Sequence, residues 1–262
     1  MKKDIAVMIS GGIDSYVAYR YAQHLYKDAF IYPMFINLKQ PYVGKELRAA
    51  KSLVGEDLIV INAPLCTEEL DNVPTVENQE IFGRNLLIAF YGANLGEEIW
   101  LAALETEMNP LAVRDKHPEF FHLTSALLTY VFKSKRFETV VKTPFGQLTK
   151  TEVIALGKSL GITDEEFLST TSCYSEKHIS CGVCSTCFKR WIAFVNNGVE
   201  CEGHFEAHPY KSNLYAKDVV RAMVREVVEG KYSGRFTLKR YNETREALIK
   251  SMGLTMPERI EK

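Results

Sequence analysis

The stretch that decides the fold of this 262-residue chain runs Ile5-Ala6-Val7-Met8-Ile9-Ser10-Gly11-Gly12-Ile13-Asp14-Ser15. Its first five residues form an apolar run, which is typical of a buried strand. The two glycines then let the chain turn with positive φ and let backbone N–H groups approach an anion without a Cβ in the way. The helix-like segment 16–25 would aim its positive amino end at the same point. The sequence therefore predicts a strand, an anion-binding loop and a helix in direct succession.

The loop resembles the phosphate-binding loop of ATP-pyrophosphatases, enzymes that adenylate a substrate. The residues predicted to bind ATP are Ser10, Gly11, Gly12, Ile13, Asp14 and Ser15. The two serine hydroxyls can donate to pyrophosphate, and Asp14 either holds a Mg²⁺ that bridges phosphate oxygens or fixes the loop by accepting backbone N–H bonds. The chain lacks the GxxxxGK[ST] pattern, which argues against ordinary γ-phosphoryl transfer. The simpler alternative is that the glycines only turn the chain and that a serine or the aspartate caps the helix.

A second motif has the spacing Cys173-x7-Cys181-x2-Cys184-x2-Cys187. Four thiols this close can form a tetrahedral thiolate site for Zn²⁺ with no open position, and Gly182 eases the tight turns between them. A redox pair formed by Cys184 and Cys187, or an iron–sulfur cluster on three or four of the thiols, is the alternative. No secretory signal is visible in residues 1–4, so disulfides are the weaker interpretation and a cytoplasmic location is expected.

Apolar runs rich in β-branched residues alternate with helix-like stretches, and this alternation sets the fold class. The runs lie at 5–9, 30–36, 58–61 and 98–103, and the helical stretches at 16–25, 45–53, 85–95 and 151–160. A βαβα order predicts an α/β fold with a doubly wound parallel sheet. The glycine loop then lies at the carboxyl end of the first strand, where open parallel sheets bind ligands.

Charge and hydropathy limit the partners. No uncharged apolar run reaches the roughly 18 residues that a membrane span needs, and a net charge of −1 predicts no strong attraction to nucleic acid. Residues 208–262 differ, with 12 Lys or Arg against 7 Asp or Glu. This tail is predicted to carry an amphipathic helix at 214–228 and a short helix at 242–252. Its packing against the core, a homodimer contact and an acidic partner are the roles considered.

The two motifs in this order resemble those of the 7-cyano-7-deazaguanine synthases, a family of ATP-pyrophosphatase-loop enzymes. Shorter matches support the comparison at Phe82-Gly83-Arg84-Asn85-Leu86-Leu87, at Thr143-Pro144-Phe145 with Leu148-Thr149-Lys150-Thr151-Glu152-Val153, and at Thr171-Ser172-Cys173-Tyr174. The resemblance covers about residues 4–195. It implies an adenine nucleotide alpha-hydrolase-like sheet with a small helical zinc-binding C-terminal part. The expected parts are an ATP-pyrophosphatase domain at 1–165, a zinc-binding segment at 166–200 and a helical basic extension at 201–262.

The resemblance also implies a reaction. ATP would adenylate the carboxylate of 7-carboxy-7-deazaguanine, ammonia would displace AMP to give an amide, and a second activation would dehydrate the amide to the nitrile. The expected cofactors are ATP, Mg²⁺ and Zn²⁺. The catalytic residues are predicted to be Asp14, Ser15, Arg84 and Lys150, and the substrate-binding residues Arg84, Asn85, Glu105 and Glu119.

One segment departs from the family pattern. The family carries Tyr-Pro-Asp-Cys-Arg soon after an acidic segment, whereas here Glu105-Thr106-Glu107 is followed, after an apparent insertion, by His117-Pro118-Glu119-Phe120-Phe121. Glu119 can take the place of the aspartate and Arg114 that of the missing cation. Two alternatives therefore stay open: a related enzyme that adenylates another target, such as tRNA or a protein amine, and a non-catalytic nucleotide-binding zinc scaffold.

Overall fold

The computed structural model describes residues 2–70, 81–108, 114–136, 138–175, 177, 179–210, 218–234 and 236–253. By packing, the chain forms two compact units. The first comprises residues 1–147 with 169–171, and the second comprises 148–168 with 172–262. The predicted division at 165/166 and 200/201 stays a prediction about functional parts.

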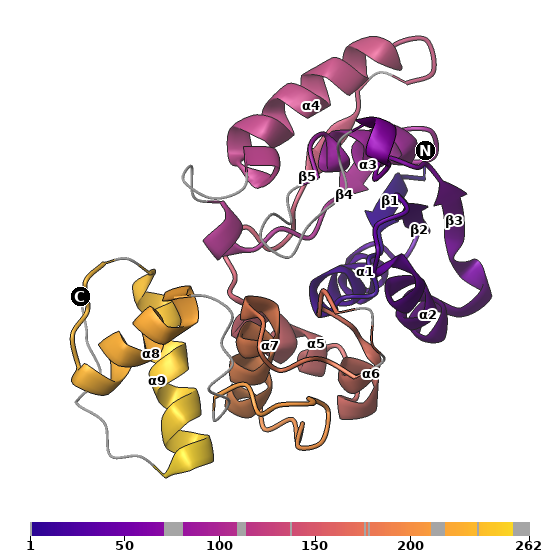
Figure 1. Ribbon diagram of the computed structural model, residues 1–262. Helices are drawn as coiled ribbons and strands as arrows, with labels where there is room; N and C mark the ends of the chain where they lie inside the picture. The colour runs from indigo at the N-terminus through magenta and orange to yellow at the C-terminus, as the bar shows by residue number, and fades with distance from the viewer. Residues whose placement is uncertain are drawn as a thin grey trace. The chain divides into compact units, whose positions relative to one another are not determined.

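The first unit is built on a five-stranded parallel sheet with the strand order β3-β2-β1-β4-β5 (Figure 1). The strands are β1 (Asp4–Met8), β2 (Phe30–Asn37), β3 (Ile59–Asn62), β4 (Glu98–Trp100) and β5 (Val140–Lys142). The strand order reverses beside β1, since β2 and β3 extend from one side of it and β4 and β5 from the other. The carboxyl end of β1 is therefore the topological switch point at which such sheets bind ligands.

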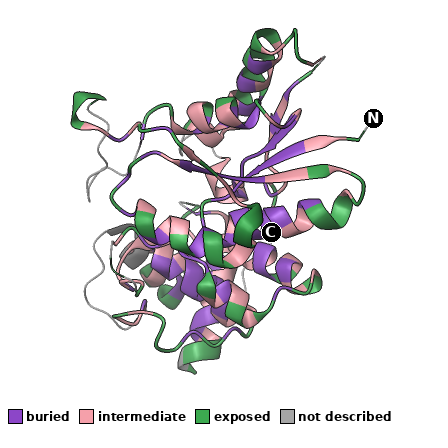
Figure 2. Cartoon of the chain, turned by 90° about the vertical axis from the view of Figure 1, so that its right-hand side faces the viewer, coloured by how far each residue is buried: buried purple, intermediate pink, exposed green. Residues whose placement is uncertain are grey.

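Helices cover both faces of this sheet. The helices α1 (Ile13–Leu25) and α2 (Val43–Val54) lie on one face, and α3 (Arg84–Gly92) and α4 (Pro118–Val131) lie on the other (Figure 1). The side chains of Ile5–Met8 in β1 are buried on both faces, and Figure 2 shows buried, intermediate and exposed stretches along the strands. Burial on both faces explains why β1 forms a continuous apolar run. The predicted doubly wound α/β fold is confirmed.

The second unit is helical. Its helices are α5 (Lys150–Ser159), α6 (Asp164–Ser169), α7 (Ser185–Asn196), α8 (Asp218–Glu229) and α9 (Leu238–Met252). The central helix α7 packs against α5 and α9, and α8 packs against α9. Arg190 of α7 is buried, donates to the carbonyl oxygens of Phe167 (3.0 Å) and Leu168 (3.3 Å), and lies over the Phe194 ring. These contacts satisfy a charge that would otherwise be costly to bury.

Each unit contains one of the two tryptophans of the chain. Trp100 of β4 donates from Nε1 to Glu98 Oε1 at 2.6 Å, and the same carboxylate pairs with Lys3 and Lys142. Trp191 of α7 stacks on Phe188 and on Tyr210, with ring centroids at 5.8 Å and 6.2 Å. Both indoles are buried.

The predicted elements agree with the observed ones where the pattern is long. All four predicted strands and the helices near 16–25, 45–53, 85–95 and 151–160 are present, with ends shifted by a few residues. The predicted helix at 214–228 is described from Asp218 onward, and residues 211–217 lie outside the described part. The helix predicted at 242–252 begins earlier, at Leu238, because the Thr237 side chain caps it.

Four elements were not predicted: β5, α4, α6 and α7. Strand β5 has only three residues, too few to show a pattern. Helix α4 falls in the segment that was compared with a pocket motif, although the His117 cap and Pro118 at the first helical position are start signals. Among the described residues, no helix is long and apolar enough to cross a membrane.

Candidate functional site

The loop between β1 and α1 is packed closely against α2. Gly11 has φ of +73°, and a Cβ at this position would lie under 3.0 Å from the carbonyl oxygen of Glu46 and 3.2 Å from Ala49 Cβ. Only glycine meets both conditions without strain. The predicted role of this glycine as the turn residue of the loop thus has a second cause, which is the approach of a neighbouring helix.

The two loop serines hydrogen-bond to each other and to the loop backbone. Ser15 Oγ donates to the Gly12 carbonyl oxygen (3.0 Å), accepts from the Ser10 N–H (3.1 Å) and lies 3.1 Å from Ser10 Oγ. Ser15 is buried, whereas Ser10 is exposed. In this arrangement Ser15 fixes the shape of the loop. The predicted donation of both hydroxyls to a phosphate stays a prediction.

The amino end of α1 is well placed for an anion. Its capping residue is Gly12, which has no side chain, and the Gly12 N–H donates to Ser10 Oγ at 3.4 Å. The Gly11 carbonyl oxygen accepts from the Thr171 N–H at 2.8 Å, which holds the loop from the other side. A helix start presents N–H groups and the positive end of the helix dipole. The simpler alternative, in which a serine or Asp14 caps the helix, stays open beside the nucleotide-binding interpretation.

A polar cluster that the sequence analysis missed lies beside the loop. Gln40 is buried and donates from Nε2 to Glu46 Oε2 at 2.8 Å. Burial raises the pKa of Glu46 to about 7, although the Gln40 hydrogen bond and the charges of Arg84 and Lys45 act in the opposite direction. The available signal was the position of Gln40 just after β2, at the same edge of the sheet as the loop.

Arg84 and Asn85 open helix α3 after Gly83, which has φ of +73°. Arg84 is partly buried. Burial raises the pKa values of Glu46 and Cys66, and the positive charge of Arg84 opposes both shifts. Asn85 is buried and donates from Nδ2 to the Asp115 carbonyl oxygen at 3.0 Å. This contact ties α3 to residues 114–116, so it is a structural role for Asn85 that the sequence comparison did not predict. Its predicted contact with a base stays a prediction.

The acidic segment 105–107 forms a short 3₁₀ turn. Glu107 is occupied, because it accepts from the Leu104 N–H (3.0 Å) and pairs with Lys116 (2.6 Å). Glu105 differs, since its Oε2 is buried and has no hydrogen-bond partner among the described residues. A buried carboxylate oxygen without a partner is an open acceptor for a ligand N–H. Of the two predicted base-binding carboxylates, Glu105 has the geometry of a binding group.

Glu119 lies in a different setting. It is exposed in the first turn of α4, where its N–H donates to His117 Nδ1 at 3.3 Å. Arg114, the predicted replacement for the missing cation, is exposed in the turn Arg114–Lys116. Residues 109–113 of the apparent insertion lie outside the described part of the chain. The predicted substrate contacts of Glu119 and Arg114 stay predictions.

Lys150 belongs to the second unit, as the first residue of α5. Thr149 caps this helix through a capping box, in which Thr149 Oγ1 accepts from the Glu152 N–H (3.2 Å) and Glu152 Oε2 accepts from the Thr149 N–H (2.8 Å). The Thr149 hydroxyl also donates to Glu243 of α9. The predicted phosphate contact of Lys150 stays a prediction.

The four cysteines of the second motif converge in the second unit. The sulfur atoms of Cys173, Cys181, Cys184 and Cys187 all lie within 4.8 Å of one another, and none of the cysteines forms a disulfide. Cys184 caps α7 and Cys187 lies in its first turn, so the helix start fixes two of the four sulfurs. A closed set of four thiolates is the ligand shell of a structural metal such as zinc.

Hydrogen bonds between the sulfurs divide the four cysteines into two kinds. The bond with Cys181 is the main cause that lowers the pKa of Cys173 to about 6, and the bond with Cys173 is the main cause that lowers the pKa of Cys184. Bonds with Cys173 are the main cause that raises the pKa of Cys181 and of Cys187. A metal ion binds cysteines as thiolates.

Segment 201–210 supports the cysteine turns. Ser180 forms a parallel bridge with Phe205, and its carbonyl oxygen accepts from the Glu206 N–H at 2.8 Å. Gly182 has φ of +73°, and a Cβ there would lie under 3.0 Å from the Ala207 carbonyl oxygen. Glycine between Cys181 and Cys184 is therefore required by the neighbouring backbone as well as by the turn.

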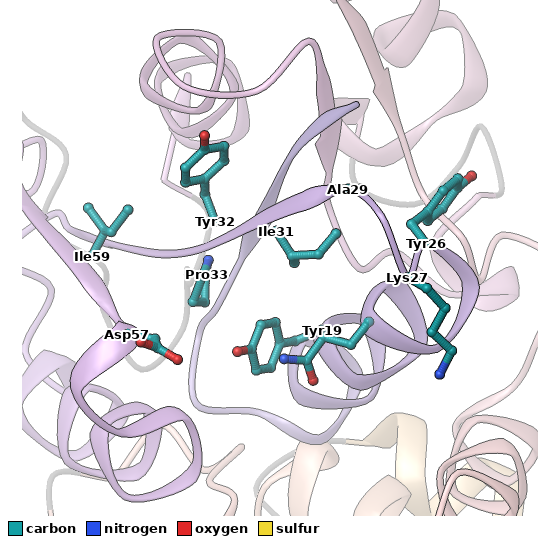
Figure 3. Close-up of a pocket in the computed structure, with 10 residues that line it drawn as sticks. Tyr19, Tyr26, Lys27, Ala29, Ile31, Tyr32, Pro33, Asp57 and Ile59 are labelled. Carbon is teal, nitrogen blue, oxygen red and sulfur yellow. The ribbon is translucent and has the colours of Figure 1, made fainter. Parts of the chain in front are cut away.

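A groove of about 490 Å³ opens at the other edge of the sheet (Figure 3). Its lining residues include Tyr19 of α1, Tyr26 just after α1, Tyr32 of β2, and Asp57. It adjoins the amino ends of β2 and β3, whereas the glycine loop follows the carboxyl end of β1. Because all strands are parallel, the groove and the loop lie at opposite edges, and we do not place the reaction in the groove.

Comparisons with known proteins identify the family of this chain. The family described as queuosine biosynthesis protein QueC matches residues 46–198. The chain is similar to the 7-cyano-7-deazaguanine synthase of Thermoplasma volcanium, at 24% identity over 84% of this chain and 97% of the relative. The enzyme of the same name from Aquifex aeolicus is 29% identical over 72% of this chain and 96% of the relative. The resemblance drawn from the motifs is confirmed, and the chain belongs to the queuosine biosynthesis protein QueC family.

Proposed function

We propose that this protein converts 7-carboxy-7-deazaguanine and ammonia to 7-cyano-7-deazaguanine with ATP as the activating substrate. The observation that carries the proposal is the glycine loop at the switch point of the sheet, followed directly by the amino end of α1, with a backbone that only glycine at position 11 permits. The curated relatives named 7-cyano-7-deazaguanine synthase support the choice of substrate.

In the proposed reaction, no protein side chain acts as a nucleophile. The substrate carboxylate attacks the α-phosphorus of ATP, and pyrophosphate leaves into the loop 10–15. Ammonia then adds to the acyl carbon, AMP leaves, and an amide results. A second ATP adenylates the amide oxygen with release of a second pyrophosphate. That oxygen departs on AMP as the amide nitrogen loses its two protons to solvent and the nitrile forms.

Charged and polar groups of the chain have distinct proposed roles. Arg84 and Lys150 stabilise negative charge that develops on the phosphates, as positioned cations do in phosphoryl chemistry. The open carboxylate oxygen of Glu105 accepts from the N–H edge of the base, with Asn85 and Glu119 as further substrate contacts. Asp14 would hold Mg²⁺, which supplies charge neutralisation at the phosphate oxygens. The four cysteines would hold Zn²⁺ as a structural ion.

The test is release of pyrophosphate from Mg·ATP by purified protein, with and without 7-carboxy-7-deazaguanine and ammonium, with the products identified by mass spectrometry. We expect base-dependent release and a nitrile product. Arg84→Met is expected to lose at least about a hundredfold in rate. Arg48→Met, a change of an exposed arginine on α2, is the matched control and keeps the wild-type rate. An inert base, with ATP still bound, would refute the proposal.

Two observations favour a second candidate, an enzyme of the same class that adenylates a tRNA or a protein amine. The chain lacks the tyrosine and the arginine of the family's pocket segment, and residues 208–262 carry 12 Lys or Arg against 7 Asp or Glu. This candidate predicts binding to tRNA that weakens steeply with salt. A cytoplasmic location and a homodimer stay predictions in either case.

A further inference from the structure

Gln40 occupies an unusual place beside the glycine loop. Strand β2 ends at Asn37, and the next turn passes through Lys39, which has φ of +63° and donates its N–H to Asn37 Oδ1 at 3.0 Å. A lysine in this region of φ is strained. The turn buries Gln40, which is only 7% exposed. Its main-chain carbonyl oxygen accepts from the Val43 N–H at 3.0 Å, where α2 begins.

The side-chain amide of Gln40 is oriented by Glu46. Its Nε2 donates to Glu46 Oε2 at 2.8 Å. Burial raises the pKa of Glu46 to about 7, and above that pH its ionised carboxylate can only accept, so it selects the amide orientation with Nε2 toward Glu46 and Oε1 away from it. In the described part of the chain, no group donates a hydrogen bond to Gln40 Oε1, although this oxygen is buried. A buried acceptor without a partner is costly and marks a place where a ligand or a water belongs.

The same glutamate connects the Gln40 side chain to the loop. The Glu46 carbonyl oxygen lies so close to Gly11 that a Cβ there would be under 3.0 Å away. Two contacts, Gln40 to Glu46 and Glu46 to Gly11, therefore join the amide to the phosphate-binding loop. Phosphate oxygens cannot pair with Gln40 Oε1, because both are acceptors. The donors that a nucleotide carries are its two ribose hydroxyls and the amino group of its base.

We propose that Gln40 is a nucleotide-binding residue, whose Oε1 accepts a hydrogen bond from an O–H or N–H donor of the bound ATP. Glu46 is its positioning residue, since it holds the amide in the accepting orientation. The inference rests on the proposed use of ATP. It adds a residue that reads the nucleoside part of the ligand, whereas the loop 10–15 is predicted to hold the phosphates.

The experiment removes the donor from the ligand and the acceptor from the protein. Dissociation constants are measured by calorimetry with Mg²⁺ and without 7-carboxy-7-deazaguanine. The ligands are ATP, 2′-deoxy-ATP, 3′-deoxy-ATP and purine riboside triphosphate. One analogue should bind the wild-type protein about tenfold more weakly than ATP does. Gln40→Met should bind ATP about as weakly, and should lose no more with that analogue. The identity of the analogue then distinguishes a ribose hydroxyl from the base amino group.

Two further variants make the result specific. Gln23→Met changes an exposed glutamine of α1 and should keep both the affinity and the discrimination of the wild type. Glu46→Gln keeps a hydrogen-bond partner for Gln40 but no longer fixes its orientation, so it should reduce the discrimination while ATP still binds. If Gln40→Met lowers the folded fraction, Glu46→Gln tests the same contact with the four ligands.

Several results would overturn the inference. Equal affinity of the wild type for all four nucleotides would show that no donor is read. If Gln40→Met weakens the binding of every nucleotide by the same factor, on top of the loss that each analogue already shows with the wild type, then Gln40 Oε1 accepts from a bound water and not from the nucleotide. Either result with nitrile formation intact refutes this inference alone. If Gln40→Met and one analogue weaken binding by the same factor, and the two losses do not add, but no nitrile forms, the proposed reaction alone is refuted. A protein that binds no ATP refutes both proposals.

Discussion

Replacement of Gly11 by alanine should destabilise the first unit by more than backbone strain alone explains. At φ of +73°, an alanine costs about 1–2 kcal/mol in free energy of unfolding. The added Cβ would also lie under 3.0 Å from the Glu46 carbonyl oxygen, where ordinary contacts begin at 3.4 Å. The neighbouring atoms are the Glu46 carbonyl oxygen and Ala49 Cβ, and neither can rotate away from the added methyl group, so α2 itself has to shift. Overpacking of this kind costs about 1–3 kcal/mol, and the total is about 2–5 kcal/mol.

Gly83→Ala separates the two contributions. Gly83 belongs to the same unit and has the same φ of +73°, but a Cβ there would have nothing within 4 Å. This variant should lose only the strain part, about 1–2 kcal/mol. Urea unfolding followed by circular dichroism measures both variants against the wild type. Gly11→Ala should also bind ATP at least about tenfold more weakly, because the loop backbone has moved.

Equal losses of stability in Gly11→Ala and Gly83→Ala would refute the reasoning. They would show that α2 yields to the extra methyl group at no cost, and that Gly11 is required for its φ alone. Unchanged ATP affinity in Gly11→Ala would separately refute the assignment of this loop to the phosphates.

Three further predictions concern the second unit. Cys187→Ser should lower the bound zinc from about one ion per chain to about none, as measured by elemental analysis after dialysis. Cys66→Ser is the control and should keep the zinc. Zinc retained by Cys187→Ser would contradict the four-cysteine site. Burial raises the pKa of Glu243 to about 7, so the folded unit holds a proton that the unfolded chain has released; the free energy of unfolding should therefore fall, by up to about 3 kcal/mol, as the pH rises from 4.5 to 7. Unfolding measured at pH 5 and 7.5 tests this, and a fall that persists in Glu243→Gln would disprove the assignment. Arg190→Met removes the donors to the Phe167 and Leu168 carbonyl oxygens and should cost about 2–4 kcal/mol; a loss below about 1 kcal/mol would mean that water replaces the guanidinium.

Local sequence patterns predicted the elements that carry the chemistry. The glycine pair after an apolar run identified the loop, and the cysteine spacing identified four sulfurs that the structure brings within 4.8 Å of one another. Both features are made by residues near in sequence, so their geometry follows from turn and helix rules. The α/β class followed from alternation for the same reason.

Contacts between distant residues could not be predicted in this way. Glu46 meets Gly11 and Gln40 only because α2 returns across the sheet edge, and no periodicity encodes that meeting. Asn85 reads as a base-binding amide in the motif, yet its donation to the Asp115 carbonyl oxygen depends on a turn 30 residues away. The order of the strands likewise depends on packing, which a single sequence does not display.

The placement of the two tryptophans gives each unit its own optical reporter. Trp100 lies in the sheet of the first unit and Trp191 in the helical core of the second, and both are buried. In Trp100→Phe the remaining tryptophan emission comes from Trp191 of α7, which stacks on Tyr210 and is only four residues from Cys187. In Trp191→Phe it comes from β4. The intrinsic fluorescence of these two variants therefore separates the melting of the nucleotide-binding sheet from that of the cysteine-bearing helices without any added dye.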